Sequence, residues 1–404
     1  MKYVGVDLHK HIIVLCVAVL VAGRPKVVRR ARFRCDQSEA VRAFFEALGP
    51  FQVVVEATAA YEWFFVLIED LADRLVLAHP KKLRVIAEST RKSDKIDAEV
   101  LAVFLALDMI PQAYRPTPRV RQHRVLVRHR CWLQRRITSL KCKVRNVLGH
   151  YNADIAGLFT RQGEQYLEAV PLSPADRFAV QALREQLRLF QRQLREADRQ
   201  LEQFGQTAPC AEQEARALLD TIPRIGPVTI DVVLSELGDW RRFRSQNAAV
   251  AFAGLDPGFR KSAGKCLELH ISKEGSRLLR WALIQAAWRL TVHSPRWRQM
   301  LERLHANTGS KKKAIVGVAR HLLCVMFAML QSSRPYELLG VPNGNERPPK
   351  CQKAARASAR ARQKGLAGTP FKENPGDRIR SDQAWDPAAT PSVVPVGDLI
   401  GRPR

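Results

Sequence analysis

The order of apolar and polar positions divides the first 110 residues into short β-rich runs and stretches with the period of a helix. Three β-rich runs come first, and strands then alternate with helices, a pattern typical of a mixed α/β sheet. The predicted strands are Tyr3–Val6, Ile12–Val21, Lys26–Phe33, Phe51–Val55 and Leu75–Ala78. The predicted helices are Ser38–Leu48, capped by Ser38, Tyr61–Ala72, and a third from Ser93 or Asp94 to Leu107. The pattern therefore predicts an α/β domain over residues 1–110.

A different pattern, free of acidic residues, covers residues 111–152. From Arg119 onwards, apolar residues recur at helical spacing and form one face of a long helix. Its other faces are basic, because residues 111–152 carry eleven Lys and Arg and no Asp or Glu. A solvated helix normally mixes charges of both signs, which support each other at i,i+4 spacing. The one-signed surface therefore predicts a helical arm that binds nucleic-acid phosphates.

The most regular apolar repeat in the chain lies in residues 173–205, where Ser173-Pro174 marks a helix start. The repeat alternates spacings of three and four, which makes a heptad seam. Its members are Val180, Leu183, Leu187, Phe190, Leu194, Ala197, Leu201 and Phe204. Two packings fit it: a coiled coil that joins two copies of the chain, or an antiparallel hairpin with helix 119–148 of the same chain.

The remaining chain is predicted to form a mainly helical domain and a disordered tail. The turn Ile222–Pro227, between helices Ala215–Thr221 and Val228–Leu237, resembles a helix–hairpin–helix, whose backbone N–H groups can meet phosphates. After Gly340 the sequence is rich in Pro, Ala and Arg and poor in large apolar residues, which predicts disorder. The expected regions are 1–110, 111–152 as a basic arm, 153–208 as a coiled coil, 209–340 and the tail 341–404.

Composition narrows the function classes. The 404 residues include 66 Lys and Arg against 39 Asp and Glu, a formal net charge of +27. Such a charge favours a polyanionic partner, nucleic acid before an anionic membrane, and disfavours a small-metabolite enzyme. The eight cysteines are scattered without a CxxC pair, which argues against zinc and disulfide frameworks and favours a reducing cytoplasm.

We expect no membrane span. The longest apolar runs, Ile12–Ala22 and Leu322–Leu330, are shorter than the ~20 residues that a spanning helix needs. The first run, preceded by Lys2 and Lys10, imitates the core of a signal peptide. Asp7 lies in the region before it, and the run fits better as a strand of the predicted sheet.

Four carboxylates stand out by their position. Asp7 ends the first predicted strand and Glu56 ends a buried one, whereas Asp94 and Asp97 share one face at a helix start. Carboxylates gathered in one cleft repel each other, and Mg²⁺, which prefers carboxylate and water ligands, removes that repulsion. Two such ions ~4 Å apart catalyse phosphoryl transfer in many enzymes. The alternative for each acid is a helix cap or a surface residue.

Several motifs resemble the DEDD-type transposases of bacterial insertion sequences, also called bridge recombinases. They are Tyr-Val-Gly-Val-Asp7-Leu-His-Lys, Val-Val-Val-Glu56-Ala-Thr and Lys92-Ser-Asp94-Lys-Ile-Asp97-Ala near the start, with Ala253-Gly-Leu-Asp-Pro-Gly258-Phe-Arg-Lys-Ser262-Ala-Gly264-Lys and Ile271-Ser-Lys273-Glu-Gly275-Ser-Arg277-Leu-Leu-Arg280 later. The resemblance covers about residues 1–340 and implies a RuvC-like, RNase H-like N-terminal domain.

The resemblance also implies a chemistry. The acidic tetrad of the family falls on Asp7, Glu56, Asp94 and Asp97, and its serine nucleophile falls on Ser262. Strand exchange would pass through a covalent phosphoserine link. Members of the family use a structured non-coding RNA that pairs with target and donor DNA, so that base pairing carries the sequence choice. The implied protein is a bacterial, nucleoid-associated dimer or tetramer, with the heptad helix as a joint.

Two positions depart from the family pattern. Ala263 intervenes before Gly264, where glycine usually follows the serine directly, and Ser276 stands where asparagine is common. Neither change removes the hydroxyl of Ser262. A serine is a weak nucleophile until its proton is removed and the phosphate charge is neutralised. The predicted phosphate-binding residues are Arg115, Arg119, Arg121, Arg124, Arg128, Arg135, Arg136, Lys141, Lys143, Arg260, Lys261, Lys265, Lys273 and Arg277.

Two other functions compete with a recombinase. A RuvC-like nuclease or junction resolvase would hydrolyse DNA with metal-bound water and form no covalent intermediate. A non-catalytic nucleic-acid scaffold would need none of the four acids or Ser262.

Overall fold

The computed structural model describes residues 1–57, 61–86, 94–262 and 265–336. For residues 84–96 and 259–269 the structure describes the backbone elements and not the side chains. The predicted disordered tail, 341–404, lies outside the described residues.

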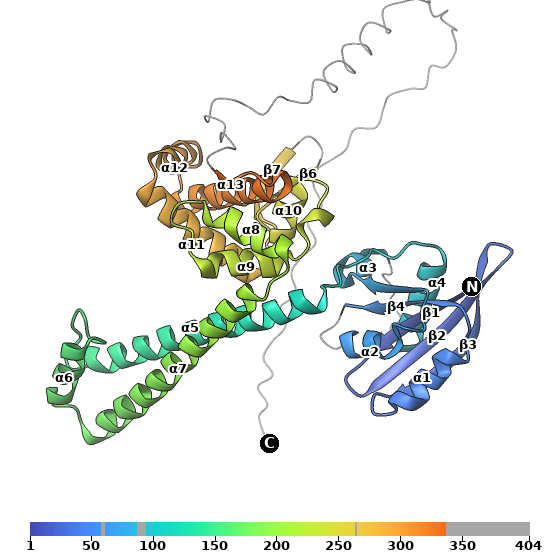
Figure 1. Ribbon diagram of the computed structural model, residues 1–404, viewed down its shortest axis with the longest axis horizontal. Coiled ribbons are helices and arrows are strands. Elements are labelled where there is room, and N and C mark those ends of the chain that lie inside the picture. The colour runs from blue at the N-terminus through green and yellow to red at the C-terminus, as the bar shows by residue number, and fades with distance from the viewer. Residues whose placement is uncertain (58–60, 87–93, 263–264, 337–404) are drawn as a thin grey trace, which may run out of the picture. The chain divides into compact units, whose positions relative to one another are not determined.

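A five-stranded mixed sheet forms the N-terminal domain, with strand order β3-β2-β1-β4-β5 (Figure 1). The first three strands are antiparallel neighbours, and β1, β4 and β5 run parallel. The strands are β1 (Lys2–Leu8), β2 (Ile12–Val21), β3 (Arg24–Arg34), β4 (Phe51–Glu56) and β5 (Arg74–Ala78). The predicted α/β domain is confirmed, and the run that imitated a signal peptide is β2.

Helices pack on both faces of this sheet. On one face, α1 (Ser38–Glu46) and α2 (Tyr61–Ile68) share an aromatic-rich core with β1 and β4. The residue before α1, Gln37, is its N-cap, so the prediction that Ser38 caps this helix was wrong. The pattern also missed α3 (Pro80–Ile86), because the proline that ends β5 begins this short helix.

The opposite face carries α4 (Asp94–Ala106), which crosses β1 at its glycine. A Cβ atom at Gly5 would lie 2.1 Å from the Ala98 carbonyl oxygen and 2.4 Å from the Ala102 nitrogen. The missing side chain therefore lets the helix backbone rest on the strand. Beyond the helix, Asp108 accepts a hydrogen bond from Arg74, the first residue of β5. Helix α4 thus ends at the amino edge of the parallel strands and begins at their carboxyl edge.

Two long helices form an antiparallel hairpin within the chain, α5 (Pro118–Gly149) and α7 (Pro174–Gln206), joined at the tip by α6 (Arg161–Ala169) (Figure 1). Thr117 and Ser173 cap the two long helices with their hydroxyl oxygens. From base to tip, the seam shares apolar clusters with α5: Leu201 with Val127 and Cys131, Leu187 with Ile137 and Leu140, and Val180 with Val144 and Leu148.

The seam therefore packs inside one chain, as in the second of the two packings that fit the repeat. The spacing of the seam was predicted correctly, but a heptad repeat fits an antiparallel partner in the same chain as well as a partner in a second chain. Helix α6 was not predicted, and its short sequence contains a glycine close to its start.

The C-terminal part is a mostly helical domain whose core surrounds α9 and α13. Its helices are α8 (Cys210–Asp220), α9 (Pro227–Leu237), the 3₁₀ turn Trp240–Arg242, α10 (Gln246–Ala253), α11 (Arg277–His293), α12 (Pro295–Thr308) and α13 (Lys311–Ser332). Helix α13 is long and apolar enough to cross a membrane, but 61% of its most apolar stretch is buried inside the protein, as in an internal core helix.

One β-hairpin, β6 (Pro257–Ser262) and β7 (Lys265–Ile271), interrupts these helices. Neither strand was predicted from the sequence, and Ser262 is the last residue of β6. Strand β6 has Phe259 as its one large apolar residue, so its sequence lacks the alternation of apolar and polar positions that predicts a strand.

The packing of the seam makes a prediction about stability. Leu187 is buried in the α5–α7 hairpin, whereas Leu189, two residues later, is 42% exposed. We expect Leu187→Ala to lower the free energy of unfolding by about 2–5 kcal/mol, because it removes buried methyl groups and leaves a cavity.

Leu189→Ala is the matched control, with an expected change within about 0.5 kcal/mol. Both are measured by denaturant unfolding, with sedimentation as a second readout. If Leu187→Ala dissociates an oligomer and leaves the unfolding of the monomer unchanged, the seam packs between chains instead.

Candidate functional site

Two of the predicted catalytic carboxylates stand side by side at one edge of the sheet. Strands β1 and β4 are parallel neighbours, and their register pairs Val6 with Val55. Asp7 and Glu56 are the next residue on each strand, at the carboxyl edge. Side chains alternate between the two faces of a sheet, and Val6 and Val55 point to the face covered by α1 and α2. The side chains of Asp7 and Glu56 therefore point to the opposite face, which α4 covers.

The third predicted acid comes to the same edge on α4. Asp97 immediately precedes Ala98, whose carbonyl group rests on Gly5, two residues before Asp7. It is exposed and belongs to the first turn of the helix. Asp94 begins that helix, but its side chain is outside the described part. Among the described residues, no group of three or more His, Cys, Asp or Glu is close enough to hold a metal ion.

The donor set at this edge suits a hard divalent cation. Asp7 is 15% exposed at its side chain, and His9, in the turn that follows β1, has its Nε2 atom 3.0 Å from Asp7 Oδ2. Carboxylate oxygens are the ligands that Mg²⁺ prefers, and two neighbouring carboxylates repel each other less when a cation lies between them. Asp7 and Glu56 are therefore the adjacent pair of described carboxylates that could face such an ion, and Asp97 lies at the same edge without completing a group of three close ligands.

Ser262 is the last residue of β6, at the tip of its hairpin. It pairs with Lys265 across the strands, and Lys261 and Arg260 pair with Cys266 and Leu267. The side chains at this tip are outside the described part, so the predicted contacts of Arg260, Lys261 and Lys265 with phosphate stay predictions.

The base of this hairpin is held firmly. The Ser272 hydroxyl donates to Asp256 Oδ1, and the Ser272 N–H donates to the Asp256 carbonyl at 3.0 Å. Buried Arg280 donates to the carbonyl oxygens of Ala253 and Gly275. A Cβ atom on Gly275 would lie 1.8 Å from the Phe252 carbonyl oxygen, so only glycine fits there.

The helix that follows the hairpin adds two of the predicted phosphate-binding residues. Ser276 accepts a hydrogen bond from the Leu279 N–H and caps α11, so a serine serves where the family pattern has asparagine. Arg277 is the first residue of that helix and is exposed, as is Lys273 in the turn before it. Lys273 has a φ of 56°, in the left-handed region.

Five of the arginines that were predicted to bind phosphate make hydrogen bonds or ion pairs with protein groups instead. Arg128 makes a bidentate pair with Glu236 of α9, with N–O distances of 2.9 and 3.0 Å. Arg124 donates to the carbonyl oxygens of Ser235 and Glu236 at the end of α9. Near the start of α5, Arg115 and Arg121 both pair with Glu62 of α2.

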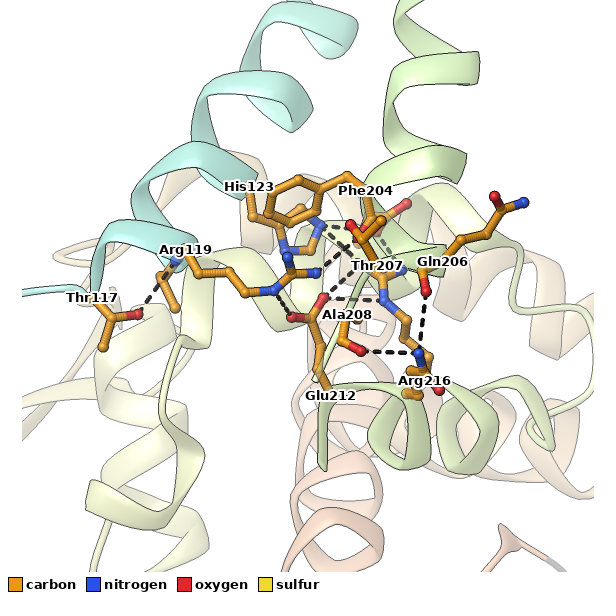
Figure 2. A network of polar contacts seen from close by, with 12 residues as sticks. Thr117, Arg119, His123, Phe204, Gln206, Thr207, Ala208, Glu212 and Arg216 are labelled. Atoms are coloured by element: carbon orange, nitrogen blue, oxygen red, sulfur yellow. Dashed lines mark hydrogen bonds and ion pairs between the residues drawn. The ribbon is translucent and has the colours of Figure 1, made fainter. Parts of the chain in front are cut away.

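The fifth, Arg119, belongs to a polar network that ties α5 to α7, α8 and α9 (Figure 2). It pairs with Glu212 and donates to the Phe204 carbonyl at 2.8 Å. Arg216 joins Glu212 to buried Asp231, which also lies 2.9 Å from His123 Nε2. Burial raises the pKa of Glu212, but hydrogen bonds from Arg119 and Arg216 outweigh it, and the pKa is lowered overall.

The middle of α5 keeps cations available. Among the described residues, Arg135, Arg136 and Lys143 form no ion pair, and all three are exposed. Trp132, which is 41% exposed, stacks on His129 and has the Arg136 guanidinium 5.4 Å from its ring centre. Lys141 lies over the ring of Phe159. The sequence prediction missed Trp132, although an aromatic residue between arginines is a recognisable signal for base stacking.

The predicted helix–hairpin–helix turn is present between α8 and α9. Gly226 is the N-cap of α9, and Arg224 has a positive φ of 63° in the turn. Asp231 and Glu236 make this second helix acidic on its buried side, which was not predicted.

Comparisons with known proteins agree with the resemblance. Residues 4–153 match a model of the DEDD transposases of the IS110 type, and residues 216–302 match the transposase IS116/IS110/IS902 family. The chain is 26% identical over 352 residues to a probable family 20 transposase of Pseudomonas aeruginosa, a match that covers 82% of this chain and 94% of the relative.

Two further relatives extend the comparison. The transposase for insertion sequence element IS1111A of Coxiella burnetii is 24% identical over 347 residues, 83% of this chain and 91% of that protein. A pilin gene-inverting protein of Moraxella bovis is 29% identical over 145 residues, 35% of this chain and 44% of its own. With the mixed α/β domain and the mostly helical domain in the matched positions, the chain belongs to the IS110-type DEDD transposases, enzymes that act on DNA.

Proposed function

We propose that this transposase cuts and rejoins DNA through a metal-dependent acidic site and a phosphoserine intermediate on Ser262, directed by a guide RNA. The observation that carries the metal site is the adjacency of Asp7 and Glu56 in register at one sheet edge, on the face where α4 begins. Asp94 and Asp97 complete the proposed tetrad. The names of the relatives support the chemistry, because transposition and gene inversion both require strands to be cut and rejoined.

At the acidic edge, the proposed ligands are Asp7, Glu56 and Asp97, with Asp94 as the fourth. Divalent ions such as Mg²⁺, one or two of them, would supply charge neutralisation at the attacked phosphate and a lowered pKa for a bound water. His9, at 3.0 Å from Asp7, holds that carboxylate in position.

At the hairpin tip, the proposed step forms a bond between Ser262 Oγ and phosphorus and breaks the bond from phosphorus to the leaving deoxyribose oxygen. The serine proton passes to a base at the acidic edge, and the leaving oxygen takes up a proton to become a hydroxyl. The energy of the phosphodiester is kept in the ester, so a second hydroxyl can rejoin the strand by the reverse step. Arg277 and Lys273 offer positive charge on the same segment of chain.

The partners proposed are target and donor DNA and a structured non-coding RNA. The exposed cations of α5, with the Trp132 platform, combine charge for phosphates with a ring for an unpaired base, which suits single-stranded and structured nucleic acid. We propose a cytoplasmic location at the nucleoid. With the α7 seam buried inside the chain, a dimer or tetramer would use other surfaces.

The metal site makes the first prediction. Asp7→Asn should lower the rate of DNA strand cleavage by at least about 100-fold, because it removes a charge that holds the ion against the phosphate. The measurement is cleavage of a labelled DNA, with thermal unfolding in Mg²⁺ or Mn²⁺ as a readout that needs no activity.

Asp73→Asn is the matched control, because Asp73 is exposed just before β5, at the amino edge of the same sheet. It should change neither readout. Cleavage that persists in EDTA, or equally in Asp7→Asn, would exclude the metal from the mechanism.

The covalent intermediate makes the second prediction. A DNA with a nick beside the cleavage position should trap a fragment on the protein that survives denaturation and maps to the peptide containing Ser262. Ser262→Ala should lose this adduct and recombination but keep nucleic-acid binding, because only one hydroxyl is removed.

Ser272→Ala and Ser310→Ala are the control variants and should keep the adduct. Ser272 already donates its proton to Asp256, and Ser310 precedes α13. Free 3′-hydroxyl and 5′-phosphate ends, made equally well by Ser262→Ala, would favour the resolvase that hydrolyses DNA.

The basic arm makes the third prediction. Replacing Arg135, Arg136 and Lys143 together by Gln should weaken binding of RNA and DNA oligonucleotides of any sequence. The log–log salt slope should shrink by up to about 0.7–0.9 for each phosphate that the variant no longer neutralises. Arg130→Gln removes the same charge from a cation paired with Asp198 and should leave the slope unchanged. An unchanged slope in the triple variant would place the nucleic acid elsewhere.

A further inference from the structure

Strand β3, at the edge of the sheet, is strongly basic. It carries six cations in eleven residues, and most of the strand is exposed. They are Arg24, Lys26, Arg29, Arg30, Arg32 and Arg34. Neither the predicted tetrad nor the basic arm includes this strand.

The pairing of β3 with β2 sorts these cations between the two faces of the sheet. Arg29 pairs with Val17, which belongs to the core under α1, and its guanidinium lies 4.4 Å from the ring centre of Phe44 in α1. Arg30, Arg32 and Arg34 alternate with these positions and point to the face covered by α4. A register shift between Val17 and Ala18 separates them from the remaining cations of the strand.

Of the three arginines on the α4 face, two already have partners. Arg30 pairs with Glu99 of α4, and Arg34 pairs with Asp36 after the strand. Within the described residues, Arg32 forms no ion pair or side-chain hydrogen bond, and it is exposed. A cation left in solvent beside two neutralised ones is the member of the strand that is available to a ligand.

Arg32 also lies in the same transverse row as the catalytic carboxylates. It pairs with Val14 on β2, and Val14 pairs with Asp7 on β1. All three side chains face α4, and Glu56 continues the row on β4. Two strand spacings, about 10 Å in all, separate the backbones of Arg32 and Asp7, with the side chain of Val14 between them.

We propose that Arg32 binds a backbone phosphate of the DNA strand that is being cut, one or two nucleotides from the attacked phosphate. A phosphate held at Asp7 and Glu56 needs its neighbouring phosphates to be held as well, and the row places an exposed guanidinium two strands away, beyond Val14, which is buried against α4. Such a contact positions the strand and carries no sequence information. The inference rests on the proposed role of the carboxylates, because they define where the cut strand passes.

The ligand is argued to be DNA because the strand attacked at the acidic edge is DNA in a transposase. RNA held on the same strand is the competing outcome. Arg29 provides an internal comparison, since it lies three residues away on β3, is exposed and carries the same charge on the opposite face.

The test uses the full chain with its co-purified RNA and duplexes that carry the junction of the element's ends, with Ca²⁺ in place of Mg²⁺ to hold cleavage back. Single phosphates across the junction are replaced one at a time by uncharged methylphosphonates. Binding is measured for the wild type, Arg32→Gln and Arg29→Gln. Circular dichroism and thermal unfolding confirm that the variants fold.

We expect the wild type and Arg29→Gln to lose severalfold affinity when a phosphate next to the cleavage position is neutralised. Arg32→Gln should bind the unmodified duplex severalfold more weakly and lose nothing further at that position. Its salt slope for DNA should fall by about 0.9. Arg32→Lys should restore part of the affinity, because it restores the charge without the planar fork.

Equal effects of Arg32→Gln and Arg29→Gln, or no effect of either, would overturn the proposal. A loss confined to binding of the RNA alone would also overturn it and assign the strand to the guide. Repeating the series in an Asp7→Asn background separates the two claims. If the effect that depends on Arg32 appears at a methylphosphonate far from the cleavage position, only the placement of the contact beside the carboxylates is refuted. Unaltered cleavage by Asp7→Asn would refute the acidic site itself.

Discussion

Helix α9 buries two carboxylates, and the helical part of the molecule is arranged to neutralise them. Asp231 and Glu236 are only 5% and 2% exposed. Arg128 of α5 holds Glu236 through two hydrogen bonds, and Arg216 of α8 holds Asp231 at 2.6 Å. Removal of one partner from a buried ion pair typically costs about 3–5 kcal/mol, because the other charge is left in the interior. The long arm and the C-terminal domain are therefore joined by charge as well as by apolar packing.

These ion pairs show a second role for the acid-free segment 111–152, which is to neutralise carboxylates of the same chain. A helix that carries only positive charge suggests a surface for phosphate, yet much of α5 meets its counter-ions on other helices: Glu62, Asp198, Glu212 and Glu236. Arg135 and Arg136 face solvent in the middle of the helix, where Arg136 lies over Trp132, and Lys143 faces solvent nearer its C-terminal end. One sequence pattern thus serves two purposes, and only contacts between segments distant in the chain separate them.

Much of the fold was predictable because its signals are local. The five strands of the N-terminal sheet, the start of α4 and the seam of α7 were all predicted from the period of apolar positions, and the adjacency of Asp7 and Glu56 was predicted because strand ends converge. Ser262 on a strand, α3 and α6 were missed, because short charged segments give no clear period. The partner of the seam depends on how two helices distant in the chain pack together. The row from Arg32 to Asp7 depends on strand register, including the shift between Val17 and Ala18, which no single segment encodes.

The length of α5 sets the distance between nucleic-acid contacts at its two ends. Its 32 residues extend about 48 Å at the rise of an α-helix. Duplex DNA advances about 3.4 Å per base pair, so the helix is as long as about 14 base pairs. A duplex that contacts both ends of α5 would therefore span more than one helical turn of DNA between the two contacts. Helix α7 packs along α5 and keeps that distance fixed.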